Sequence, residues 1–164
     1  MKLAAVLSCI FSFILLLLQA GCEPSKVATE PMPKTFCVPA RVHILPLTEL
    51  IQDRDAEGTS QVKVYVSLLD SFGSQIKAPA VFRFELYEYV QRSSEPRGRR
   101  IAIWPDMDLN EPAENNKFWR DFLRAYEFSL PFEPESDKSY IIQATCLCPD
   151  GRRLSAEFTL KQTK

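Results

Sequence analysis

The feature that most constrains this chain is the strict alternation of apolar and polar residues over many short segments. In residues 62–68, for example, four aliphatic side chains alternate with lysine, tyrosine and serine. Because successive side chains of a strand point to opposite faces, each such segment predicts a strand with one face in a core and the other in water. Seven segments show the pattern: residues 42–44, 62–68, 82–87, 101–103, 126–130, 142–146 and 154–161.

Turn-forming residues separate these segments. Residues 71–74 (SFGS) interrupt the chain after the second segment, and residues 149–151 (PDG) predict a tight hairpin between the last two. About seven short strands with such turns predict an all-β fold, an antiparallel two-sheet sandwich of immunoglobulin-like or transthyretin-like kind. The segment 137–140 (DKSY) resembles the tyrosine corner of these sandwiches. Tyr140 precedes Cys146 by six residues rather than two, so the resemblance is to the architecture and not to antibody domains.

One segment departs from the strand pattern. In residues 115–125 (NNKFWRDFLRA), Phe118 with Phe122 and Trp119 with Leu123 have the i,i+4 spacing of a helix. We therefore expect one short inserted helix over residues 115–125 that crosses an end of the sandwich and packs on its core. Its N-cap is expected to be Asn110 or Asn115. A second interpretation leaves Phe118 and Trp119 protruding as a partner contact.

The N-terminus has the composition of an export signal. Met1 and Lys2 give a positive start, and residues 3–18 are apolar except for Ser8 and Ser12. Small residues follow, so residues 1–21 are predicted to be a signal peptide, with a retained anchor helix as the alternative. The apolar run is shorter than the roughly 20 residues that a spanning helix needs.

The end of this run, Ala20-Gly21-Cys22, resembles the lipobox of bacterial lipoproteins, although Gln19 stands where an apolar residue is usual. The resemblance implies that Cys22 becomes the N-terminus and that its thiol carries the lipid. In enterobacteria an Asp after that cysteine favours inner-membrane retention, so Glu23 favours the outer membrane. Residues 22–35 then form a lipidated, proline-containing linker, and residues 36–164 form the sandwich domain.

The charge of the exported chain gives no reason to expect nucleic acid as a partner. The whole chain has 20 basic and 21 acidic residues, and loss of residues 1–21 removes Lys2, which leaves a net charge of −2. Its partners are instead expected to be the membrane, through the lipid, and an envelope protein.

Three cysteines remain after export and lipidation: Cys37, Cys146 and Cys148. An oxidising compartment favours pairing, and three thiols leave one over. A bridge from Cys37 to Cys146 or to Cys148 is expected, because a first strand running parallel to the last brings Cys37 near the end of the penultimate strand. The alternative is a Cys₃His zinc site that adds His43.

Motifs for catalysis are missing from the sequence. No nucleophile elbow, metalloprotease helix, phosphate-binding loop or dinucleotide fingerprint occurs, and we expect no cofactor. Asp106 paired with Glu111 or Glu114 gives a candidate carboxylate pair for hydrolysis. A weak calcium-site alternative uses Asp106, Asp108, Asn110 and Glu111, although the EF-hand pattern fails.

A basic cluster lies in residues 91–100 (QRSSEPRGRR). Its members are Arg92, Arg97, Arg99 and Arg100, predicted to lie on a long hairpin loop. The simple interpretation is a solvated loop, and the alternative is contact with an anionic envelope component.

The sequence therefore predicts a lipid-anchored, non-catalytic binding or assembly module of the bacterial cell envelope, facing the periplasm. A lipobox, a transthyretin-like sandwich and an added helix resemble in plan the envelope lipoproteins of type VI secretion systems. No motif identifies a specific family for residues 36–164. The alternative is an envelope hydrolase or carbohydrate-active protein that uses the loop carboxylates.

Overall fold

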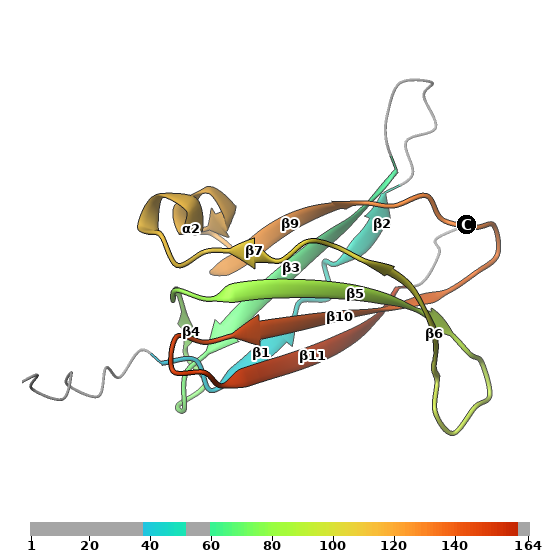
Figure 1. Cartoon of the computed structure of the whole chain (residues 1–164), viewed down its shortest axis with the longest axis horizontal. Coiled ribbons are helices and arrows are strands. Elements are labelled where there is room, and N and C mark those ends of the chain that lie inside the picture. Colours follow the sequence, from blue (N-terminus) through green and yellow to red (C-terminus); the bar gives the residue numbers. More distant parts are fainter. Residues whose placement is uncertain (1–37, 52–59, 161–164) are drawn as a thin grey trace, which may run out of the picture. The chain divides into compact units, whose positions relative to one another are not determined.

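A computed structural model describes residues 38–51 and 60–160, all within one compact unit, Thr35–Lys164. Figure 1 shows this unit as two layers of strands with one short helix at an end. The predicted signal peptide, Cys22, the linker and Cys37 lie outside the described residues.

The first sheet has six strands and is built around β3 (Gln61–Leu69). β3 pairs with β1 (Arg41–Ile44) on one side and with β9 (Ala125–Pro131) on the other, and β9 pairs with β8 (Trp119–Arg120). Two short strands, β2 (Glu49–Ile51) and β4 (Gln75–Ile76), also pair with β3. All of these pairings are antiparallel.

The second sheet has five strands in the order β11-β10-β5-β6. These are β11 (Arg153–Leu160), β10 (Tyr140–Leu147), β5 (Val81–Tyr89) and β6 (Arg97–Ile103), while β7 (Met107–Asp108) pairs with the start of β5. Its pairings are antiparallel too, and register shifts interrupt the β5–β6 ladder.

The prediction of an all-β sandwich is confirmed. Each of the seven alternating segments lies in a strand, the last of them as far as Leu160, where the described residues end: β1, β3, β5, β6, β9, β10 and β11. The first, second and fifth of these share one sheet, and the third, fourth, sixth and seventh share the other. This crossing of the chain between sheets is a Greek-key order of the immunoglobulin-like kind.

The core lies between the two sheets and is rich in aromatic rings. Phe82 and Phe84 of β5 meet Tyr126 and Phe128 of β9, with ring centroids 4.7–5.3 Å apart across the layers. All four side chains are fully buried. The alternation in the sequence is therefore explained: the apolar side chains of each strand face the opposite sheet and form the core.

The predicted turns form as expected. Asp150 and Gly151 join β10 to β11, with Gly151 at a φ of 83° that favours glycine. Tyr140 is 1% exposed, and its hydroxyl accepts a hydrogen bond of 2.9 Å from the backbone N–H of Glu135. The tyrosine thus bonds the chain a few residues upstream, as in a tyrosine corner.

The two ends of the sandwich differ. At one, which we name the proximal end, lie the start of β1 and the turns of residues 70–74, 121–124 and 148–152, together with the helix α2 (Pro112–Phe118) (Figure 1). Arg152 donates to the Pro39 carbonyl and Arg124 to the Gln75 carbonyl, which ties these segments together. The opposite, distal end carries the β5–β6 hairpin loop of residues 90–96.

Candidate functional site

The inserted helix forms but its limits differ from the prediction. It runs over Pro112–Phe118 rather than residues 115–125, and its N-cap is Glu111, without a side-chain cap, rather than Asn110 or Asn115. Pro112 suits the first helical turn because it lacks the N–H that would be unpaired there. Trp119 is already extended and pairs with Tyr126 in β9, so sheet pairing ends the helix.

Asn115 holds α2 on the sandwich. It is 5% exposed, and its amide nitrogen donates to the carbonyls of Ala78 (3.0 Å) and Leu109 (2.9 Å). Its oxygen lies 3.1 Å from the hydroxyl of Tyr126, which also accepts from the Ala78 N–H at 3.0 Å. Burial raises the pKa of Tyr126, so the hydroxyl stays protonated and able to donate.

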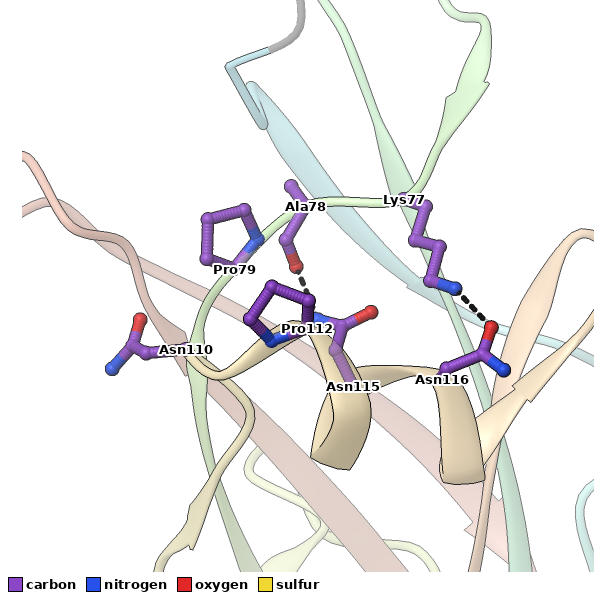
Figure 2. A pocket seen from close by; sticks show the side chains of 7 residues that line it. All are labelled: Lys77, Ala78, Pro79, Asn110, Pro112, Asn115 and Asn116. Atoms are coloured by element: carbon purple, nitrogen blue, oxygen red, sulfur yellow. Dashed lines mark hydrogen bonds between the residues drawn. The ribbon is translucent and has the colours of Figure 1, made fainter.

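A surface pocket of about 410 Å³ lies beside this network (Figure 2). Pro79 and Pro112 form its apolar part, and Lys77 and Asn116 close one side through a 2.6 Å hydrogen bond. The Asn115 side chain is already bonded on both its nitrogen and its oxygen. The polar side chains that line the pocket are already bonded to neighbouring protein groups. Few donors and acceptors therefore remain to orient a small molecule.

Phe118 and Trp119 pack against the core, as the first interpretation of the helix expects. Phe118 stacks on Phe128 with centroids 5.2 Å apart, and Trp119 meets Tyr126 edge-on at 5.1 Å. The Trp119 indole N–H donates to Asp121. Both side chains are partly buried, and a contact of their remaining exposed surface with a partner stays a prediction.

The most exposed aromatic residues are two that the sequence analysis did not select. Phe72, between β3 and β4, is 81% exposed, and Phe122, between β8 and β9, is 83% exposed. Both lie in turns at the proximal end. The signal for Phe72 was available in the sequence, because an aromatic residue between Ser71 and Gly73 sits in a turn with no alternating partner.

The four arginines of the predicted basic cluster do not act as one patch. Arg97 donates to Glu157 at 2.8 Å and lies 5.0 Å over the Tyr87 ring, and Arg100 donates to Glu85 at 2.7 Å. These contacts place both arginines on the outer face of the five-stranded sheet, where carboxylates balance them. Arg92 and Arg99 are exposed. Arg92 lies in the distal turn with a φ of 61°, so a contact with an anionic component would involve the distal end.

Two of the carboxylates proposed for hydrolysis, Asp106 and Glu114, are held by cations. The two oxygens of Asp106 accept hydrogen bonds of 2.7 Å from Nε and from one terminal nitrogen of Arg83, and this hydrogen bonding lowers the pKa of the Asp106 carboxyl. An acid catalyst needs a raised pKa, so Asp106 is poorly suited to that role. Glu114 pairs with Lys117 on α2.

The weak calcium-site set does not converge either. Asp108 accepts from the backbone and side-chain N–H groups of Asn110, whereas Asp106 is bound to Arg83. Glu111 is exposed at the start of α2. Within residues 38–51 and 60–160, no group of three or more His, Cys, Asp or Glu side chains is placed to hold a metal ion.

The two described cysteines lie at the end of β10. Cys146 and Cys148 are buried and free in the structure, and burial raises the pKa of each thiol. Cys37, their predicted partner, lies outside the described residues, so the bridge stays a prediction. His43 is exposed on β1 in the other sheet, whereas both thiols are buried. The alternative zinc site also needs Cys37, so it stays a prediction.

Among the described helices, none has the length and apolar character to cross a bilayer. Comparisons of the chain with models of protein families, with curated proteins and with solved structures find no match.

Proposed function

We propose that this protein is a lipid-anchored, non-catalytic binding or assembly module of the bacterial cell envelope. The observation that carries the proposal is the apolar run of residues 3–18 that ends in Ala20-Gly21-Cys22. A thiol at that position is the nucleophile that can take a lipid as a thioether. Because each buried CH₂ adds about 0.8 kcal/mol, several acyl chains together hold a protein firmly on a membrane.

The described domain is consistent with a binding role. Its outer sheet face carries paired charges, such as Arg100 with Glu85 and Arg97 with Glu157. Two of the three carboxylates proposed for hydrolysis are engaged, Asp106 by Arg83 and Glu114 by Lys117, and the third, Glu111, is exposed at the start of α2. No specific observation favours the hydrolase alternative.

A fatty-acid probe tests the anchor directly. Cells that express the full chain are fed an alkynyl fatty acid, and label on the protein is compared between wild type and Cys22→Ala. We expect label on the wild type and none on Cys22→Ala. Cys9→Ala is the matched control, since Cys9 lies inside the apolar run and would be removed with the signal peptide. Label that persists in Cys22→Ala refutes Cys22 as the attachment site.

The predicted membrane has its own test. Separation of inner and outer membranes on a density gradient should place the wild type in the outer-membrane fraction of an enterobacterial host. Glu23→Asp should move the protein to the inner membrane without loss of label. Equal distributions of wild type and Glu23→Asp would contradict the role assigned to Glu23.

A further inference from the structure

Two phenylalanines stand out against the rest of the aromatic residues. Phe82, Phe84 and Phe128 are fully buried between the sheets, whereas Phe72 and Phe122 are 81% and 83% exposed. An exposed phenyl ring gains nothing for folding, since its apolar surface stays in water. Two such rings at the same end of one small domain therefore mark a contact surface.

Both rings stand on turns that are held in place. In the first turn, one oxygen of the Asp70 carboxylate accepts from the backbone N–H groups of Phe72 (2.9 Å) and Ser74 (2.8 Å). In the second, Arg124 adopts a φ of 50° and its guanidinium donates to the Gln75 carbonyl at 2.8 Å. Gln75 follows Phe72 by three residues and Arg124 follows Phe122 by two, so this bond links the two turns.

Three cations accompany the rings. The guanidinium of Arg41 lies beside Gly73, the guanidinium of Arg124 bridges the two turns, and Lys77 lies 5.8 Å from the centroid of the Trp119 ring. Within the part of the chain that the structure describes, none of the three makes an ion pair with a carboxylate. They differ in this from Arg97 and Arg100, which are both paired.

The carboxylates of the two turns are engaged by N–H donors. Asp70 is nearly buried and serves the backbone of its own turn. Asp121, next to Phe122, is exposed and accepts from the indole N–H of Trp119 at 2.7 Å. The two turns thus combine apolar rings and cations that are available to an anionic partner with one exposed carboxylate, Asp121. Elsewhere at the proximal end, the exposed Glu114 and Asp150 are paired with Lys117 and Arg152, and Glu111 is exposed at the start of α2.

The course of the chain indicates which partner this is. Val38, the first described residue, lies at the same end, because Arg41 of β1 pairs with Leu69 at the end of β3 and Arg152 bonds the Pro39 carbonyl. Fifteen residues separate Cys22 from Val38. Fully extended they span at most about 50 Å, so a lipid on Cys22 keeps this end of the domain close to the bilayer.

We propose that the proximal end of the sandwich contacts a phospholipid bilayer with anionic headgroups, into which Phe72 and Phe122 insert at the interface. The inference rests on the proposed function, because a bilayer is the neighbour that lipidation of Cys22 provides. Interfacial binding grows with the apolar area buried and with attraction of cations to anionic lipid. Arg41, Lys77 and Arg124 supply the second contribution.

The test uses the mature chain from residue 22 with Cys22→Ser, so that no acyl chain contributes to binding. Its sedimentation is measured with vesicles of phosphatidylcholine alone and of phosphatidylcholine mixed with phosphatidylglycerol. We expect binding to the mixed vesicles that falls as salt is raised. Because the chain carries no lipid, the result is independent of whether Cys22 is acylated in cells.

Two matched pairs of variants test whether vesicle binding depends on this surface rather than on exposed residues elsewhere in the protein. Phe72→Ser with Phe122→Ser should weaken binding at least about tenfold, since both rings leave the interface. Leu47→Ser, which changes a side chain that is 53% exposed between β1 and β2, should leave binding unchanged. Arg124→Gln should weaken binding to the mixed vesicles, whereas Arg92→Gln at the distal end should not.

Three results would overturn the proposal. One is a wild-type chain that stays in solution with both kinds of vesicle. The second is equal binding by the wild type and the double phenylalanine variant. The third is a wild-type chain that is a dimer in the absence of lipid while the double phenylalanine variant is a monomer. That result would assign this surface to a second copy of the chain. Circular dichroism confirms that the variants are folded, and vesicle binding by the wild type tests the proposal even if they are not.

Discussion

Replacement of Asn115 by alanine should reveal how α2 is held on the sandwich. The change removes two hydrogen bonds donated to the carbonyls of Ala78 and Leu109 and one accepted from the Tyr126 hydroxyl. Ala78 keeps its bond with the Tyr126 hydroxyl, but the Leu109 carbonyl loses its amide donor in a residue that is 1% exposed. An orphaned buried carbonyl costs about 1–3 kcal/mol, and each remaining bond contributes about 0.5–1.5 kcal/mol.

We therefore expect Asn115→Ala to lower the free energy of unfolding by roughly 2–6 kcal/mol. The neighbouring Asn116 is the matched control, because it is exposed and, among the described residues, its side chain bonds the Lys77 ammonium alone. Asn116→Ala should change stability by less than about 0.5 kcal/mol. Urea denaturation followed by circular dichroism measures both, and the midpoint for Asn115→Ala should fall by about 1–3 M.

An isosteric variant separates hydrogen bonding from packing. Asn115→Asp keeps the size of the side chain but replaces the two N–H donors by an oxygen that faces two carbonyls. Near neutral pH, Asn115→Asp should lower the free energy of unfolding at least as much as Asn115→Ala does. Part of this stability should return at low pH, when the new carboxylate is protonated. If Asn115→Ala and Asn116→Ala shift the midpoint equally, the network does not hold α2 and this reasoning is refuted.

Three further predictions concern the core and the cysteines. Phe118→Ala should lower stability by about 2–4 kcal/mol in urea denaturation, since its ring packs on the core, and a change under about 0.5 kcal/mol would show that it does not. Because burial raises the pKa of Tyr126, wild-type stability should fall as pH rises above the unfolded pKa of about 10. Tyr126→Phe should lack that part of the fall, and equal slopes would contradict it. Cys148→Ala, but not Cys146→Ala, should abolish a bridge to Cys37 that closes a loop of about 110 residues and contributes about 4–5 kcal/mol. Peptide mapping under non-reducing conditions decides which pair exists.

Cys148 is the expected partner for a reason that the structure supplies. Its backbone N–H donates to the carbonyl of Arg152, and the Arg152 guanidinium donates to the carbonyl of Pro39. Pro39, which follows Cys37 by two residues in the sequence, is therefore tied to the hairpin turn that starts at Cys148. Cys146 lies two residues further into β10 and is fully buried among core side chains. The sequence alone left this choice open.

The helix shows how far local spacing can be used for prediction. The i,i+4 pairs Phe118–Phe122 and Trp119–Leu123 predicted a helix as far as residue 125. In the structure the helix ends at Phe118, because Trp119 and Arg120 pair with Tyr126 and Ala125 of β9. Sheet hydrogen bonds compete with helical ones for the same backbone groups, and the winner depends on where β9 lies.

The arginines illustrate the same limit for the candidate sites. A run of basic residues at positions 92–100 is visible in the sequence, but the partners of Arg97 and Arg100 are not. Glu157 and Glu85 lie 60 and 15 residues away in the chain: Glu85 is on β5, the neighbour of β6, and Glu157 is on β11, beyond β5 and β10. Side chains that are adjacent in a sheet can be far apart in the chain, so charge balance on the outer face could not be predicted.

By itself the sequence determined the class of the fold and the positions of its seven main strands. Alternation with a period of two is a local property, and it suffices because a half-buried strand exposes every second residue to water. The tertiary structure alone decided which strands are neighbours, where the helix ends, which charges are paired and which rings remain in water. Phe118 and Phe122 are identical residues four positions apart, yet one packs on the core and the other is 83% exposed. That difference arises because burial depends on the elements that fold back over a residue, which no local pattern encodes.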